Sequence, residues 1–219
     1  GAGLMGRLLA HALAQQWHRV EVHEAQGPDA TGSAARVAAA MLAPLAESAI
    51  TELPVVRMGQ YGLRRWPELL ATLAQPVFFQ QNGTLVVWHR QDAAEARRLG
   101  QQLQRHQQQL PTLAAPVLLD AAGMGEQEAG LAGRFSQGLL LPGEGQLDNR
   151  QLLQALLDSL QAQGVVLHWH SHRTPADFEP GRAGQPDWLI DCRGLGARPQ
   201  WAGLRGVRGE VLRLHAPDV

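Results

Sequence analysis

Three glycines at the start of the sequence constrain its fold more than any other feature. Residues 1–6 read Gly-Ala-Gly-Leu-Met-Gly, and residues 7–14 continue as a helix-forming run with apolar side chains on more than one face. Residues 19–24 then alternate apolar and polar side chains, which is typical of a strand, and they end on Glu24. The glycine turn, helix, strand and terminal acid follow one another at the spacing of a dinucleotide-binding unit.

The role expected of each residue in this segment matches its chemical type. Gly1 permits the tight turn, Gly3 lets the backbone approach a pyrophosphate, and Gly6 lets the helix pack closely on the sheet. The helix N-terminus then faces the anion. Glu24 can accept hydrogen bonds from an adenosine ribose and would repel a 2′-phosphate, so NADP is disfavoured against NAD or FAD. The candidate cofactor-binding residues here are Gly1, Gly3, Leu4, Met5, Gly6 and Glu24.

Composition removes several classes of function. The formal net charge of -1 and the pI of about 6.8 give no basic field for a phosphate backbone, so we expect no nucleic-acid partner. No lysine occurs in the chain, which excludes a pyridoxal-phosphate Schiff base and a Walker-type phosphate loop within these residues. No apolar run reaches the roughly 18 to 20 residues that span a bilayer, so no membrane partner is expected. The single cysteine, Cys192, predicts a reducing compartment and a cytoplasmic protein.

Residues 31–47 contain an unusual number of small side chains, mostly alanine. One interpretation is a tightly packed helix or loop under the sheet. The other is a backbone kept bare so that a flat ring and a diphosphate can approach it. The residues alone leave both interpretations open.

The order of these motifs resembles the D-amino-acid oxidase family, and within it the glycine oxidases of thiamine biosynthesis. The resemblance rests on the opening glycines, Glu24 and the segment 31–47, with Gly-Ser-Ala-Ala followed by Ala-Ala-Met-Leu-Ala-Pro. Further matching segments are residues 128–132, 142–148, 188–197 and 205–214. The resemblance covers almost the whole chain.

This resemblance implies an α/β fold with two interleaved domains. An FAD-binding, Rossmann-like domain of the glutathione-reductase type would contain residues 1–74 and 130–204. Part of a smaller α+β substrate domain would contain residues 75–129 and 205–219. It also implies a chain truncated at both ends, with the first strand before Gly1 and the substrate-clamping residues beyond Val219.

The resemblance further implies which residues contact FAD. Those expected near the diphosphate are Ser33, Ala35 and Arg36. Those expected along the flavin ring are Ala39, Ala40, Met41 and Leu42. The backbone of Arg173 would lie near the adenine, and the return turn at the cofactor would consist of Cys192, Arg193 and Gly194. No side chain need act as a base in this family, so we expect no catalytic residue and no metal ligand.

The activity implied is oxidation of the C–N bond of a small amino acid or amine, similar to glycine or sarcosine. The product would be an imine, and oxygen would reoxidise the flavin to give hydrogen peroxide. The alternatives are an NAD-dependent dehydrogenase, a flavin dehydrogenase with another electron acceptor, and a non-catalytic dinucleotide-binding module. A homo-oligomer is left open.

Two positions depart from the family pattern. Trp17 stands between the first helix and the second strand where relatives usually have glycine, which removes a favourable left-handed cap. Ala40 stands where many relatives have glycine, so the backbone would approach the flavin less closely.

Local patterns predict the remaining elements. We expect helices at residues 51–73, 91–110 and 148–163, the second of them a polar, solvated helix. Asp148 is the expected N-cap of the third helix. Residues 77–81 and 84–89 read as the two strands of a hairpin around Asn82-Gly83. A further strand is expected at residues 165–170, and the resemblance implies a strand and return turn within residues 188–197 and another strand at residues 205–214.

Two further residue groups invite a chemical role that we do not assign. His168, His170 and His172 alternate along an expected strand, which would place them on one face. No acid accompanies them, so a polar strand face is the expectation rather than a metal site. Cys192, at a strand end, is expected to be a small buried side chain rather than a nucleophile.

Overall fold

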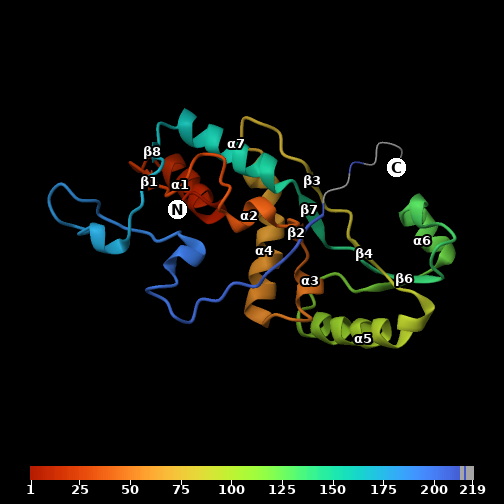
Figure 1. Cartoon of the computed structure of the whole chain (residues 1–219). Coiled ribbons are helices and arrows are strands. Elements are labelled where there is room, and N and C mark those ends of the chain that lie inside the picture. The colour runs from red at the N-terminus through yellow and green to blue at the C-terminus, as the bar shows by residue number, and fades with distance from the viewer. Residues whose placement is uncertain (213–214, 216–219) are drawn as a thin grey trace. The chain divides into compact units, whose positions relative to one another are not determined.

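The computed structural model describes residues 1–212 and 215 (Figure 1). They form a mixed α/β structure that divides into two compact units. The first unit contains residues 1–40, 71–78 and 148–212, and the second contains residues 41–70 and 79–147.

The borders of these units differ from the predicted domain borders. Residues 41–70 and 130–147 were expected in the FAD-binding domain, and they pack within the second unit. Residues 75–78 and 205–212 were expected in the substrate domain, and they belong to the first unit. Because a compact unit is defined by packing and a domain here by the ligand it binds, the assignment of FAD and substrate to the two domains stays a prediction.

The first unit is built on two parallel strands and two helices that lie side by side in Figure 1, α1 and α7. Strand β1 pairs with β8 in parallel, and His23 lies opposite His168 in the register. The core between helices and strands consists of Ala2, Ala10, Val22, Leu160 and Val165. The elements of this unit are α1 (Leu4–Gln15), β1 (Glu21–His23), α2 (Ala34–Val37), α7 (Asn149–Ala162), β8 (Val166–His168), η3 (Pro175–Asp177) and η4 (Gly194–Ala197).

Helix α7 begins where the sequence predicts it. The Asp148 side chain accepts hydrogen bonds from the N–H groups of Arg150 and Gln151, at 2.8 and 2.9 Å. This N-cap satisfies two of the donors that the first turn of a helix leaves without an intrahelical partner. The apolar face of the helix then buries a row of leucines: Leu152, Leu153, Leu156, Leu157 and Leu160.

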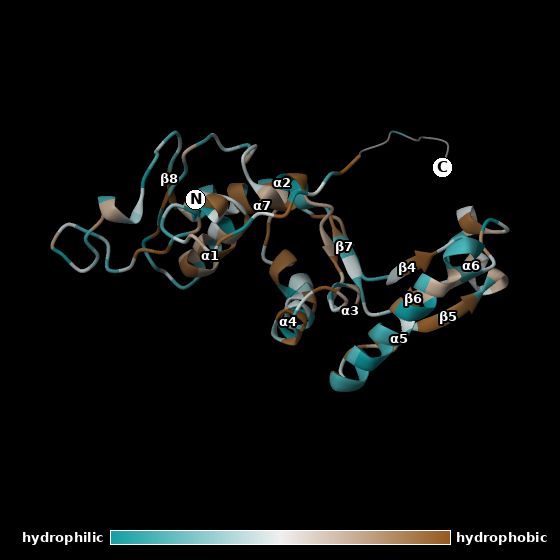
Figure 2. Cartoon of the chain, turned by 60° about the horizontal axis from the view of Figure 1, so that its bottom comes forward, coloured by the Kyte–Doolittle hydropathy of each residue, from teal (hydrophilic) through white to brown (hydrophobic). Residues whose placement is uncertain are grey.

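The second unit contains two antiparallel sheets, with strand orders β2-β7-β3 and β4-β6-β5. Its core consists of Leu45, Val56, Leu103, Leu110, Leu113, Leu139 and Leu141. Figure 2 shows the apolar residues of β4 and β5 against the mostly polar surface of α5, which confirms the polar helix expected from the sequence. The elements are β2 (Met41–Leu42), α3 (Pro44–Glu47), α4 (Leu53–Leu70), β3 (Phe79–Gln80), β4 (Thr84–Val87), η1 (Arg90–Asp92), α5 (Ala93–Gln109), β5 (Val117–Asp120), α6 (Ala121–Gln127), η2 (Ala129–Leu131), β6 (Gln137–Leu141) and β7 (Gly145–Leu147).

The predicted hairpin at Asn82-Gly83 is wrong. Strand β3 pairs with β7 and β4 pairs with β6, so the two strands belong to different sheets. Gly83 has a φ of 91° and donates its N–H to the carbonyl oxygen of Glu144 at 2.9 Å. The positive φ of Gly83 therefore bends the chain between β3 and β4. The chain then continues along the facing segment of β6 and β7 and does not reverse its direction. A glycine with positive φ serves a bend of this kind as readily as a turn.

The strand predictions also fail beyond residue 168. Strand β8 ends at His168, and His170 has a φ of 54°, so the three alternating histidines do not share a strand face. Residues 188–192 and 205–212 form no strand, because their backbone has no ladder partner within the described part of the chain. Residues 213 and 214 of the last predicted strand lie outside the described residues.

Trp17 adopts a left-handed backbone conformation. This conformation is unfavourable for a residue with a Cβ atom, as expected at a position where relatives usually have glycine. Its φ is 64° and its side chain is 95% exposed. The N–H of His18 donates to the carbonyl of Leu13 at 3.2 Å, and the N–H of Trp17 donates to that of Ala14 at 3.0 Å. This pair of hydrogen bonds is the Schellman motif, in which glycine is the preferred residue at the left-handed position.

We predict that Trp17→Gly stabilises the protein, because it relieves the left-handed strain of a residue with a Cβ atom. Trp17→Ala is the matched control, since it removes the same exposed ring and keeps the Cβ. The glycine variant should exceed the alanine variant by roughly 0.5 to 1 kcal/mol in the free energy of unfolding, measured by denaturant titration. Equal stabilities of the two variants would contradict the assigned backbone conformation.

Candidate dinucleotide-binding site

The glycine turn packs against the segment that contains Cys192. A Cβ atom added to Gly6 would overlap the carbonyl oxygen of Gly1, and one added to Gly1 would lie 2.5 Å from the carbonyl oxygen of Cys192. Neither position can accept a side chain, because the obstructing atoms belong to the backbone. The return turn predicted at Cys192 and Arg193 therefore lies directly beside the glycine turn.

Helix α1 presents an open N-terminus next to Gly3. Gly3 is the N-cap, no side chain of the described residues caps the helix, and no acid lies in its first turn. A Cβ atom at Gly3 would meet only Ser33, at 3.0 Å from its hydroxyl oxygen. Leu4 is half-buried and Met5 is 69% exposed. The first turn thus has no side-chain cap on its N–H groups and no acid of its own, as a diphosphate site requires.

Glu24 directly follows β1 and lies at the glycine turn. Its Oε2 atom accepts the N–H of Ala2 at 2.6 Å, and its Oε1 atom accepts the N–H of Gln26 at 3.0 Å. The N–H of Ser171 donates to the Glu24 carbonyl at 2.8 Å, so the segment leading to Arg173 leaves the sheet beside the acid. The carboxylate, the helix N-terminus and the path to Arg173 are therefore brought together.

The segment after Ser33 is held by residues of α7. The side-chain amide of Asn149 donates to the carbonyl oxygens of Ala35 and of Ala38, the latter at 2.8 Å. Arg36 donates from Nη1 to the carbonyl oxygen of Asp29 at 2.8 Å. Ser33 lies beside Gly3, whereas the guanidinium of Arg36 is engaged with the loop before α2. The diphosphate contacts expected from Ala35 and Arg36 stay predictions.

The return turn is fixed by an ion pair. Arg193 donates from Nε and Nη2 to the two carboxylate oxygens of Asp191, at 2.9 and 2.7 Å. The hydrogen bond to Arg193 holds the pKa of Asp191 below its usual range. Burial raises the pKa of the Cys192 thiol, which favours the neutral form and not a nucleophilic thiolate. Gly194 then has a φ of 55°, where the chain turns into η4.

The residues expected along the flavin ring are divided between the two units. Ala39 and Ala40 belong to the first unit, and Ala40 has a φ of 58°, a conformation that favours the glycine of relatives. Met41 and Leu42 form β2 of the second unit and pair with Gln146 and Gly145. Their common contact with a flavin stays a prediction.

The sequence analysis missed Arg7. This residue is 1% exposed and donates to three backbone carbonyl oxygens: that of Ala2 at 2.7 Å, that of Pro28 at 2.6 Å and that of Leu153 at 2.6 Å. Burial lowers the pKa of the guanidinium, and the carboxylates of Glu24 and Asp29 oppose the shift. The sequence did offer a signal for this residue, because an arginine stands directly after Gly6 inside a mostly apolar helix.

The sequence analysis also missed His11, one turn further along α1. The imidazole is fully buried, and its Nε2 atom lies 3.0 Å from the hydroxyl of Thr72. Its Nδ1 atom lies 3.1 Å from the hydroxyl of Ser159 and 3.2 Å from the amide nitrogen of Gln163. Burial lowers the pKa of this histidine. The buried face of α1 is therefore partly polar, and the polar groups join the helix to α7.

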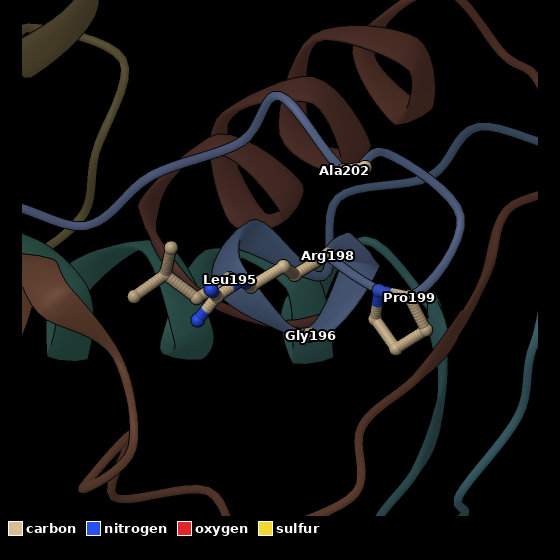
Figure 3. Close-up of a pocket in the computed structure, with 5 residues that line it drawn as sticks. All are labelled: Leu195, Gly196, Arg198, Pro199 and Ala202. Atoms are coloured by element: carbon tan, nitrogen blue, oxygen red, sulfur yellow. The ribbon is translucent and has the colours of Figure 1, made fainter.

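An open hollow of about 620 Å³ lies at η4, outside the predicted site (Figure 3). The side chains of Leu195 and Pro199 lie on opposite sides of the turn and do not converge on one point. We place no function there.

No helix among the described residues is long and apolar enough to cross a membrane.

Comparison with known proteins identifies the family. The sequence model described as "DAO: FAD dependent oxidoreductase" matches residues 1–219. The chain belongs to this family of FAD-dependent oxidoreductases. It is 31% identical over 225 residues to a Rhizobium etli protein provisionally named thiamine biosynthesis oxidoreductase ThiO, a match that covers 100% of this chain and 60% of that protein.

Solved structures share the fold. Glycine oxidase from Bacillus cereus matches with a TM-score of 0.63 at 18% identity, over 78% of this chain and 44% of that chain. Glycine oxidase from Geobacillus kaustophilus matches with a TM-score of 0.63 at 22% identity, over 78% of this chain and 45% of that chain. Iminodiacetate oxidase from Chelativorans matches with a TM-score of 0.62 at 20% identity, over 77% of this chain and 45% of that chain. The chain thus spans less than half the length of these structures.

We predict that Gly3→Ala weakens FAD binding while leaving the fold intact. The new methyl group meets only the movable hydroxyl of Ser33, but it occupies the surface where a diphosphate approaches the helix. The dissociation constant for FAD, from flavin fluorescence, should rise at least roughly 10-fold, which is about 1.4 kcal/mol. Gly100→Ala, in the middle of α5, is the control and should leave FAD binding unchanged.

Proposed function

We propose that the whole protein oxidises the C–N bond of a small amino acid or amine, similar to glycine or sarcosine, to an imine. FAD supplies the hydride acceptor when it is bound. Oxygen then accepts the electrons and leaves as hydrogen peroxide. The single cysteine supports a cytoplasmic location for this activity.

The observation that carries the proposal is the convergence of four elements on the N-terminus of α1. The bare backbone at Gly3, the carboxylate of Glu24, the hydroxyl of Ser33 and the turn at Cys192 meet there within one compact unit. The chain's own residues fit a dinucleotide: the helix dipole suits the diphosphate, and an acid at the strand end suits ribose hydroxyls. Membership of the FAD-dependent family identifies which dinucleotide this is.

Support for the substrate class comes from the relatives. Two of the similar structures are named as glycine oxidases and one as an iminodiacetate oxidase. Glycine and iminodiacetate are both small amino acids. The ThiO-named protein of Rhizobium etli is assigned by its name to thiamine biosynthesis. These names belong to those proteins, and the fold likeness alone does not fix a substrate. Glycine and sarcosine are therefore the first compounds to test.

The role of these residues in the reaction is to hold FAD and to keep proton-accepting side chains away from it. The first turn of α1 and Glu24 would anchor the adenosine diphosphate half, distant from the reacting carbon. The left-handed backbone at Ala40 leads from that anchor toward Met41 and Leu42. No side chain from Ala39 to Leu42 can take up a proton. Positioning, not acid–base chemistry, is the proposed contribution of these residues.

The alternative is a dehydrogenase of the same fold that passes electrons to another acceptor. It shares every binding feature described above and differs only in its reaction with oxygen. An NAD-dependent enzyme is not supported, because the chain belongs to an FAD-dependent family.

The test is the visible absorption of the purified protein during anaerobic addition of glycine or sarcosine. The proposal predicts loss of the oxidised flavin bands, followed by their return and one equivalent of hydrogen peroxide when oxygen is admitted. Bleaching without return in oxygen would support the dehydrogenase. Flavin bands that neither compound bleaches would contradict the proposed substrate class, and a protein that binds no FAD would contradict the proposed function.

A further inference from the structure

Three potential metal ligands lie together on one face of the β1–β8 ladder. Glu21 and His23 are two residues apart in β1, so their side chains project from the same face. His168 of β8 is the register partner of His23 in the parallel pair. Val22, between the two ligands of β1, points to the opposite face and joins the core. The strand register therefore sets this grouping, independently of individual side-chain rotamers.

The distances within this Glu-His-His cluster are short. One candidate ligand atom from each of the three side chains lies within 4.8 Å of the other two. The Oε2 atom of Glu21 lies 3.2 Å from Nε2 of His168, and the rings of His23 and His168 stack with centroids 4.3 Å apart. Ligand atoms around a tetrahedral zinc ion are separated by roughly 3.4 Å, given bond lengths near 2.0 to 2.1 Å. The two rings are stacked with an interplanar angle of 9°, so the half-buried His168 ring has to turn out of this stack for both histidines to direct a nitrogen at one ion.

A hydrogen bond of the kind that orients metal ligands is also present. The Nδ1 atom of His23 lies 3.0 Å from the hydroxyl of Ser171, and Phe178 packs edge-on against the His23 ring. Ligating histidines commonly use their second nitrogen in this way, which fixes the ring orientation. Arg19 contacts the cluster through Oε1 of Glu21 at 3.0 Å, and its side chain is 87% exposed. That contact leaves Oε2, the oxygen that faces His168, directed into the cluster.

We propose that Glu21, His23 and His168 form a binding site for a divalent transition-metal ion of the zinc class. Two imidazoles and one carboxylate suit Zn²⁺, Ni²⁺ or Cu²⁺ and are poor ligands for Mg²⁺ or Ca²⁺, which prefer oxygen. The three protein ligands leave at least one coordination position for water. The site joins two strands whose ends lead to Glu24 and to Arg173, so a bound ion would brace the ribose side of the dinucleotide site.

The test uses the purified flavoprotein, stripped of metal with a chelator and titrated with Zn²⁺ in a calorimeter. We expect one equivalent of bound Zn²⁺, and an association constant at least roughly 10-fold lower in His168→Ala and in Glu21→Gln. Glu21→Gln keeps the shape of a half-exposed side chain, so it decides the question if His168→Ala fails to fold. His172→Ala, an exposed histidine outside the cluster, is the matched control and should bind zinc as the parent does.

Two results would overturn the proposal. One is the absence of saturable zinc binding by the parent protein. The other is binding that Glu21→Gln and His168→Ala both leave unchanged, which would place the ion elsewhere. Flavin content and reduction by glycine, measured on the same samples, report the proposed enzymatic function separately.

Discussion

The guanidinium of Arg7 holds three backbone segments at one point. It donates to the glycine turn at Ala2, to the loop after β1 at Pro28, and to α7 at Leu153. A planar fork with donors in several directions can satisfy three carbonyl groups that a single ammonium would serve less well. Loss of this group would remove a donor from the buried carbonyl of Ala2, at about 1 to 3 kcal/mol if that carbonyl finds no other partner. Arg7 and Glu24 together hold the glycine turn, because one binds the carbonyl oxygen of Ala2 and the other binds its N–H.

The local geometry of the candidate dinucleotide site could be predicted from the sequence because its parts follow local rules. Gly1, Gly3 and Gly6 are required by close backbone approaches, and the structure shows those approaches at Gly1 and Gly6. Glu24 is recognisable from its place at the end of an alternating strand, and its carboxylate does reach the glycine turn. The N-cap at Asp148 follows the same logic. Each of these features is recognisable from a local sequence pattern, even where its partner is distant in the sequence, as Cys192 is from Gly1.

The remaining features depend on partners that lie far away in the sequence. The turn signal at Asn82-Gly83 is real, but the facing segment of β6 and β7 decides that the chain bends there and does not reverse. Arg7 and His11 look like interruptions of an apolar helix until α7 is placed beside them. The acid missing from the histidine-rich segment was present in β1 and became visible only through the register of β1 with β8.

The central claim is that the first unit recognises the adenosine diphosphate half of FAD. The most direct test is a comparison of FAD and FMN, which share the flavin and differ in that half, by fluorescence titration of the flavin-free protein. The account predicts that FAD binds at least roughly 100-fold more tightly than FMN, which is about 2.7 kcal/mol. Equal affinities for the two flavins would show that the glycine turn and Glu24 contribute nothing to binding, and would contradict the account.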